Sequence, residues 1–218
     1  MTREQAILLA TDSYDSGALQ AALARRVAYA TESEVPEQAP AQHAYLNEDL
    51  VPRLEELGFA CRVHPNPAGV DLPILVARRD EGPALPTVLM YGHGDVVRGN
   101  AAKWEAGRDP WRLQVEGDRW YGRGTADNKG QHTINLEALR QVIAARGGKL
   151  GFNAVWLIET GEEAGSPGLA AFCEAQRDAL AADVFIAGDG PRLSAQRPTL
   201  FMGSRGAVNF ELTLRARR

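Results

Sequence analysis

Three short apolar runs, each followed at once by acidic or imidazole side chains, constrain this chain more than any other feature of its sequence. The segments VLMYGHGDVV, VWLIETGEEAG and VFIAGDGP carry, in that order, His93 and Asp95, Glu162 and Glu163, and Asp189. In open α/β sheets, ligands bind beyond the carboxyl ends of the strands. We therefore expect these side chains to point into one crevice.

Helical and strand-like segments alternate along the chain. A helical period over residues 3–30 has Gly17 as a candidate interruption, and a second helix at residues 43–58 contains Pro52, where we expect a boundary or kink. Strands are expected at residues 60–63, 72–77, 87–91, 153–158 and 184–187, a hairpin at 111–124, and helices at 128–146 and 167–180. Such alternation predicts an α/β fold with a central, mostly parallel or mixed sheet and helices on both faces.

The last segment has the period-two pattern of a half-buried strand. Phe210, Leu212 and Leu214 alternate with polar residues, and the sequence ends at Arg218 without a turn or cap. A half-polar strand needs a partner sheet. We therefore interpret residues 1–206 as one α/β domain and residues 207–218 as the first strand of a second domain that is cut off.

Composition excludes several classes of partner. The 218 residues are 44% apolar and 24% charged, which is ordinary for a globular domain. The formal net charge of −4 gives no basic field for nucleic acid. No apolar run approaches the roughly 20 residues that span a bilayer, and the N-terminus lacks the apolar core of a signal peptide. We expect a cytoplasmic protein with neither a nucleic-acid nor a membrane partner.

The crevice needs positive charge. A further segment, YGRGTADNKGQ, places Asp127 in a glycine-punctuated loop before a helix. Several carboxylates and a histidine in one pocket repel one another unless a cation lies among them. Oxygen and imidazole ligands suit zinc, with manganese or cobalt as substitutes. The pattern thus favours a pair of divalent metal ions, and with them hydrolysis.

Taken one at a time, these motifs have simpler explanations. A lone histidine such as His93 is more often structural than functional. Asp127 could be an ordinary helix N-cap, and Asp189, between two glycines, could be a turn residue. Their joint occurrence at strand ends and glycine-rich turns favours a site over separate coincidences.

The adjacent Glu162 and Glu163 also have two interpretations. They could form a solvated acidic loop. On an irregular turn, however, neighbouring side chains point in different directions, so one can ligate a metal while the other acts as general base. His132, one turn into the helix after Asp127, is interpreted as a packing or surface residue.

The order GHGDVV, YGRGTADNKG, ETGEEAGSPGL and then a strand ending in aspartate resembles one family. It is that of the co-catalytic zinc hydrolases, which include carnosine dipeptidase, aminoacylase, carboxypeptidase G and succinyl-diaminopimelate desuccinylase. The resemblance runs from about Val88 to Phe210 and is strongest to the dipeptidase branch. It implies a zinc metallopeptidase that hydrolyses a dipeptide-like amide bond, with small peptides or N-acyl amino acids as substrates and a homodimeric full-length protein.

The resemblance also implies a role for each metal ligand. His93 and Asp189 would ligate one metal ion and Glu163 the other, with Asp127 bridging both. The two ions would be zinc, or else manganese or cobalt.

Two further residues take catalytic roles by the same resemblance. Glu162 would be the general base, and Asp95 would orient His93. The bond between Asp127 and Asn128 would be a cis peptide.

The chain departs from the family pattern in one respect. The family uses another metal-binding histidine near the C-terminus and a histidine from a lid domain, but no histidine follows His132 here. We therefore expect an incomplete, inactive or weakly active fragment of a hydrolase, in which residues 207–218 begin an α+β lid and dimerisation domain. Two alternatives stay open: an N-acyl amino acid deacylase or desuccinylase with the same metal site, and a non-catalytic metal-binding or interaction fragment.

Overall fold

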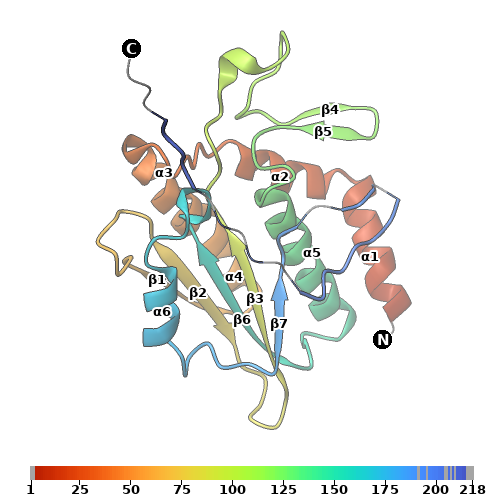
Figure 1. The fold of residues 1–218 in the computed structure, drawn as a ribbon. Coiled ribbons are helices and arrows are strands. Elements are labelled where there is room, and N and C mark those ends of the chain that lie inside the picture. The colour runs from red at the N-terminus through yellow and green to blue at the C-terminus, as the bar shows by residue number, and fades with distance from the viewer. Residues whose placement is uncertain are drawn as a thin grey trace, which may run out of the picture.

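A mixed five-stranded sheet forms the centre of the computed structural model (Figure 1), which describes residues 3–190, 192–194, 196–203, 206, 208 and 210–214. In spatial order its strands are β1 (Ala60–His64), β2 (Ile74–Arg79), β6 (Asn153–Glu159), β3 (Thr87–His93) and β7 (Val184–Ala187). The pairs β1–β2 and β2–β6 are antiparallel, whereas β6, β3 and β7 run parallel to one another. Helices lie on both faces, so the predicted fold class is confirmed.

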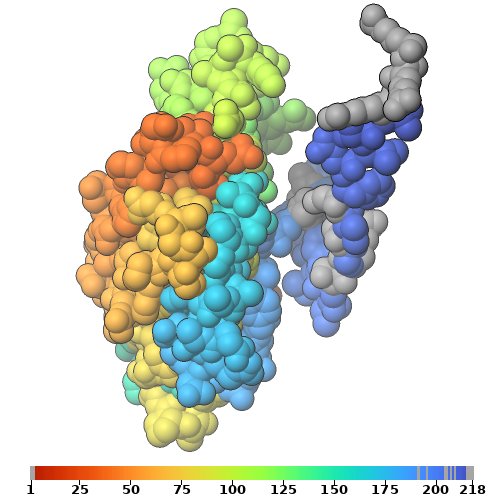
Figure 2. All heavy atoms as spheres, turned by 60° about the vertical axis from the view of Figure 1, so that its left-hand side comes forward, coloured from red at the N-terminus to blue at the C-terminus, as the bar shows by residue number. Residues whose placement is uncertain are grey.

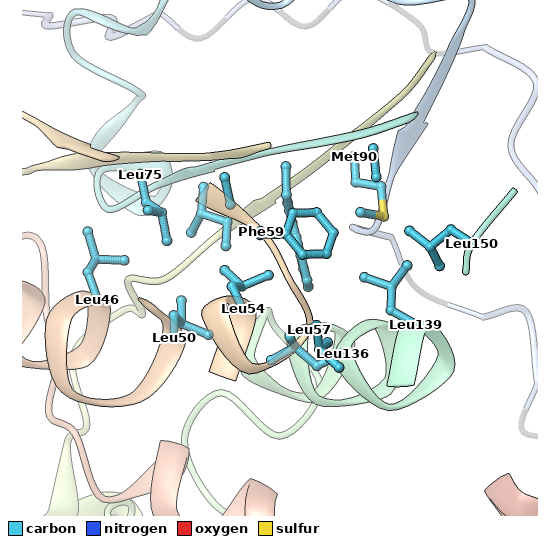
Figure 3. Close-up of a cluster of buried hydrophobic side chains, with 14 of the residues drawn as sticks. Leu46, Leu50, Leu54, Leu57, Phe59, Leu75, Met90, Leu136, Leu139 and Leu150 are labelled. Carbon is cyan, nitrogen blue, oxygen red and sulfur yellow. The ribbon is translucent and has the colours of Figure 1, made fainter. Parts of the chain in front are cut away.

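The two faces of the sheet pack against different helices. On one face lie α1 (Arg3–Asp15), α2 (Ala18–Val27), α5 (Lys129–Ala145) and the segment from α3 (Ala39–Ala44) to α4 (Val51–Glu56), while α6 (Leu169–Ala175) covers the other. Successive side chains of β6 point alternately to the two faces of the sheet. Trp156 and Ile158 join the larger core with Leu54 and Leu136, shown in Figure 3, and Leu157 joins the smaller one beside α6.

Glycine and proline divide the N-terminal helices where the sequence predicts it. Gly17 separates α1 from α2 with a positive φ of 79°, which suits a residue without Cβ. Between α3 and α4, the π-helical segment η2 (Tyr45–Leu50) absorbs the expected irregularity. Pro52 then falls in the first turn of α4, directly after this π-helical segment.

A short hairpin lies beyond the end of the sheet where the parallel strands finish. The predicted hairpin forms from β4 (Gln114–Glu116) and β5 (Arg119–Tyr121), and it projects beyond that end in Figure 1. Three 3-10 turns complete the described elements: η1 (Pro36–Gln38), η3 (Ala101–Lys103) and η4 (Glu162–Ala164). Among the described residues, no helix combines the length and apolarity needed to cross a membrane.

The strand predicted at residues 207–218 is not formed in the part that the structure describes. Residues 208 and 210–214 belong to no strand, because no neighbouring strand supplies ladder hydrogen bonds, and Phe210, Leu212 and Leu214 are almost fully exposed. In Figure 2 the dark-blue atoms of this segment stand apart from the body of the molecule. Residues 207, 209 and 215–218 lie outside the described residues, and the division into two domains stays a prediction.

At the opposite end of the sheet, the carboxylate of Glu81 binds the turn that leads into β6. Glu81 accepts hydrogen bonds from the backbone N–H groups of Leu150 and Gly151, each at 2.7 Å, and from the guanidinium of Arg79 at 2.7 and 3.0 Å. Burial alone would raise the pKa of Glu81, but these bonds and the Arg79 charge lower it below its ordinary value of 4.5. The charged form of Glu81 therefore stabilises the fold.

We predict that Glu81→Gln lowers the free energy of unfolding at pH 7 by about 1–2 kcal/mol, the scale of a charge-assisted hydrogen bond. Because the pKa of Glu81 is lower in the folded chain than in the unfolded chain, this contribution is complete above the ordinary pKa of 4.5. It is lost as pH falls through the lowered pKa. Urea unfolding at pH 7 and pH 3.5 measures both effects, with the exposed Glu48→Gln as control. If the difference in free energy of unfolding between Glu81→Gln and the unchanged chain is as large at pH 3.5 as at pH 7, this prediction is wrong.

Candidate metal centre

The order of the strands places the expected crevice at the carboxyl end of β3. The connection from β3 reaches β6 through α5 on one face of the sheet, and the connection from β6 reaches β7, on the other side of β3, through α6 on the opposite face. Such a reversal is where open α/β sheets bind ligands. His93 ends β3, Glu162 and Glu163 follow β6, and Asp189 follows β7.

His93 aims one ring nitrogen at carboxylates from three different segments. Its Nε2 lies 2.8 Å from Asp127 Oδ1, 3.6 Å from Asp189 Oδ2 and 3.9 Å from Glu162 Oε2. The imidazole is fully buried, whereas the Asp127, Glu162 and Asp189 side chains are 60%, 39% and 28% exposed. The carboxylates thus form the outer rim of the crevice and the imidazole its floor.

The other ring nitrogen of His93 is held by Asp95, which is also fully buried. His93 Nδ1 lies 3.1 Å from the backbone oxygen of Asp95 and 3.3 Å from its Oδ1. Since a carbonyl oxygen only accepts, Nδ1 carries the proton and donates. The two carboxylate oxygens of Asp95 accept hydrogen bonds from the backbone N–H groups of Glu162 at 3.2 Å and Glu163 at 3.0 Å. Metal-binding histidines typically have their second nitrogen held in this way.

Glu163 completes a group with metal-ligand spacing. One ligand atom each from His93, Asp127 and Glu163 can be chosen so that all three lie within 4.8 Å of one another. The structure therefore gathers all six residues singled out in the sequence at one crevice: His93, Asp95, Asp127, Glu162, Glu163 and Asp189.

The charges at this crevice are poorly compensated by the protein itself. Burial is the largest cause that raises the pKa values of Glu162, Glu163 and Asp189; repulsion by neighbouring carboxylates also raises them, and the charge of His93 opposes both. Burial opposes protonation of His93, but hydrogen bonds to Asp127 and Asp95 and their charges raise its pKa to about 11. A proton on His93 Nε2 thus balances the carboxylates. A divalent cation can take its place, because imidazole and carboxylate donors suit zinc and its substitutes.

The sequence does not mark Glu159, the last residue of β6, as a site residue, because it ends an apolar run and fits the pattern of the strand. Its buried Oε1 accepts hydrogen bonds from the hydroxyls of Tyr91 at 2.6 Å and Ser166 at 2.8 Å. Burial is the largest cause that raises the pKa of Glu159. Since Ser166 follows η4, Glu159 ties down the loop that carries Glu162 and Glu163.

His132 packs beneath the crevice, as one of its two predicted roles requires. It is fully buried, shares a 2.9 Å hydrogen bond with the Tyr45 hydroxyl through Nδ1, and meets the Trp156 ring edge-on. The floor above it is tight. A Cβ added to Gly92 would lie 2.8 Å from His132 Nε2 and 2.7 Å from Asn128 Oδ1. The peptide bond between Asp127 and Asn128 is cis, as the resemblance implied.

We predict that Gly92→Ala destabilises the protein by about 1–3 kcal/mol, the usual effect of forcing a methyl group into a packed core. The control is Gly203→Ala, because no heavy atom of the described residues lies within 4 Å of a Cβ built there. Urea denaturation measures both. Equal stability of the two variants would show that the floor of the crevice has room to spare.

Comparison with known proteins gives consistent relatives. The sequence profile described as Peptidase family M20/M25/M40 matches residues 89–214. The chain is 38% identical over 175 residues to a cysteinylglycine-S-conjugate dipeptidase of Corynebacterium striatum, covering 78% of this chain and 37% of the relative. It is 29% identical over 172 residues to a succinyl-diaminopimelate desuccinylase of Legionella pneumophila, covering 76% and 43%.

A solved structure agrees with these sequence relatives. The fold is similar to the crystal structure of human carnosine dipeptidase 1, with a TM-score of 0.77, 25% identity, and coverage of 88% of this chain and 42% of that one. The chain thus spans about two fifths of the length of these three proteins.

Proposed function

Because this chain belongs to peptidase family M20/M25/M40, we propose that its crevice is the metal site of a dipeptide hydrolase. The observation that carries the proposal is the approach of three carboxylates, from Asp127, Asp189 and Glu162, to a single buried imidazole nitrogen. Without a bound cation, the proton on His93 is the positive charge described among these carboxylates, each of which disfavours the charge of the others.

The proposed ligands divide between two divalent ions. His93 and Asp189 would hold one ion, Glu163 would hold the other, and Asp127 would serve both. The donor set of imidazole and carboxylates fits zinc, with manganese or cobalt as alternatives. When bound, such ions polarise the scissile carbonyl and make water a better nucleophile at neutral pH.

Glu162 is the proposed general base. Its carboxylate stands at the mouth of the crevice, 39% exposed and 3.9 Å from His93 Nε2, within reach of both solvent and substrate. Burial raises the pKa of Glu162, which moves it toward the range where a base both accepts and returns a proton. It would take the proton of the attacking water and pass it to the leaving amine, while Asp95 keeps the imidazole of His93 fixed.

Dipeptides are the proposed substrates. The relatives include a cysteinylglycine-S-conjugate dipeptidase, and the similar fold is that of a carnosine dipeptidase. N-acyl amino acids are the second candidate, because a succinyl-diaminopimelate desuccinylase is 29% identical over most of this chain. A homodimeric full-length protein and a cytoplasmic location stay predictions from the sequence.

Zinc binding tests the metal site directly. We predict that the chain binds zinc in isothermal titration and that His93→Ala weakens binding at least about tenfold, because it removes a ligand. The matched control is His43→Ala, since His43 is a partly exposed histidine of α3 that pairs with Asp71. If the chain binds no zinc, or if His93→Ala binds zinc with the same affinity as the unchanged chain, the proposed metal site is wrong.

The proposed base is tested by turnover. In a full-length protein that contains this segment, we predict that Glu162→Gln lowers kcat for dipeptides by about 10²–10⁴-fold, the usual share of a general base, while zinc still binds. The control is Glu174→Gln, an exposed residue of α6, which should leave kcat unchanged. Near-normal turnover in Glu162→Gln would exclude this residue as the base.

A further inference from the structure

The ladder between β3 and β7 stops one step before the crevice. Its paired residues run from Val88 and Val184 to Tyr91 and Ala187, and the N–H of Gly188 donates to the carbonyl of Tyr91 at 2.9 Å. In a parallel pair, the next residue to bond on the same side lies two positions further along. The next rung would therefore join the His93 N–H to the Gly188 carbonyl and set His93 opposite Asp189.

The side-chain amide of Asn128 occupies that rung. Its Oδ1 accepts a hydrogen bond from the His93 N–H at 3.3 Å, and its Nδ2 donates to the Gly188 carbonyl at 2.8 Å. A primary amide is suited to this, since it offers an acceptor and donors on one planar group. Asn128 is fully buried, and the absence of a side chain at Gly92 leaves room for its Oδ1.

The inserted amide separates two strands that would otherwise bond directly. His93 and Asp189 stand at their ends, with Nε2 and Oδ2 3.6 Å apart. We infer that Asn128 is a positioning residue: by bridging the His93 N–H and the Gly188 carbonyl, it sets the separation between His93 and Asp189 and thereby controls zinc affinity. This rests on the proposed function, in which these two residues hold one ion.

The test compares two buried asparagines at opposite ends of the sheet. Asn153, at the start of β6, accepts from the N–H groups of Glu81 and Gly82 and donates to the carbonyls of Gly82 and Leu85. Asn153→Ala removes four hydrogen bonds to backbone groups, against two for Asn128→Ala, so it should disturb folding at least as much while lying far from the crevice. Both variants are titrated with zinc alone, at a temperature where circular dichroism shows each to be folded.

We predict that Asn128→Ala weakens zinc binding by about 10–100-fold, the usual effect of losing a group that orients metal ligands. Asn153→Ala should stay within about twofold of the unchanged chain. The visible absorption of bound cobalt should also change in Asn128→Ala and not in Asn153→Ala, because it responds to ligand geometry. If Asn128→Ala does not fold, Asn128→Leu keeps the volume filled while removing both hydrogen bonds.

The outcomes separate the two proposals. If the unchanged chain binds no zinc, or binds it equally well in His93→Ala, the proposed metal site fails. If the unchanged chain binds zinc and His93→Ala weakens binding, but the folded Asn128 variant retains full affinity and the same cobalt spectrum, only the role of Asn128 is overturned. Equal weakening in the Asn128 and Asn153 variants also overturns it, since general destabilisation then explains the loss.

Discussion

The buried carboxylate of Asp95 is the contact on which the crevice depends. It stands against one nitrogen of His93 and accepts the backbone N–H groups of Glu162 and Glu163, so it joins the end of β3 to the turn after β6. A buried charge is tolerated only when its hydrogen-bonding capacity is used, and here both oxygens have donors. Through this one side chain, residues almost 70 positions apart in sequence share a fixed frame.

The sheet supplies the rest of that frame. Parallel pairing of β3 with both β6 and β7 brings three strand ends to one edge, and α5 and α6 lie on opposite faces of the sheet. Glu159 and Ser166 then fix the turn that follows β6, as the Asn128 amide bridges the ends of β3 and β7. The crevice is thus set by strand order first and by buried polar contacts second.

Much of this fold can be predicted from sequence because its signals are local. Apolar runs bounded by glycine mark β3, β6 and β7, and Pro52 marks the irregular turn between α3 and α4. The contacts of Asn128 cannot be predicted in this way, because they join groups 35 and 60 residues apart through the register of two strands. The alternation from Phe210 to Leu214 predicts a strand that does not form, because a local pattern gives a strand only when another strand pairs with it.

The crevice combines a rigid floor with a loose rim. His93 and Asp95 are locked in place with no exposed surface, while Asp127 and Glu162 keep much of theirs in solvent. Exposed carboxylates retain rotamer freedom that buried groups have lost. The rim carboxylates can therefore change rotamer while His93 and Asp95 stay in place. On the proposed function, an ion would enter and leave by rotation of these side chains, without opening of the sheet.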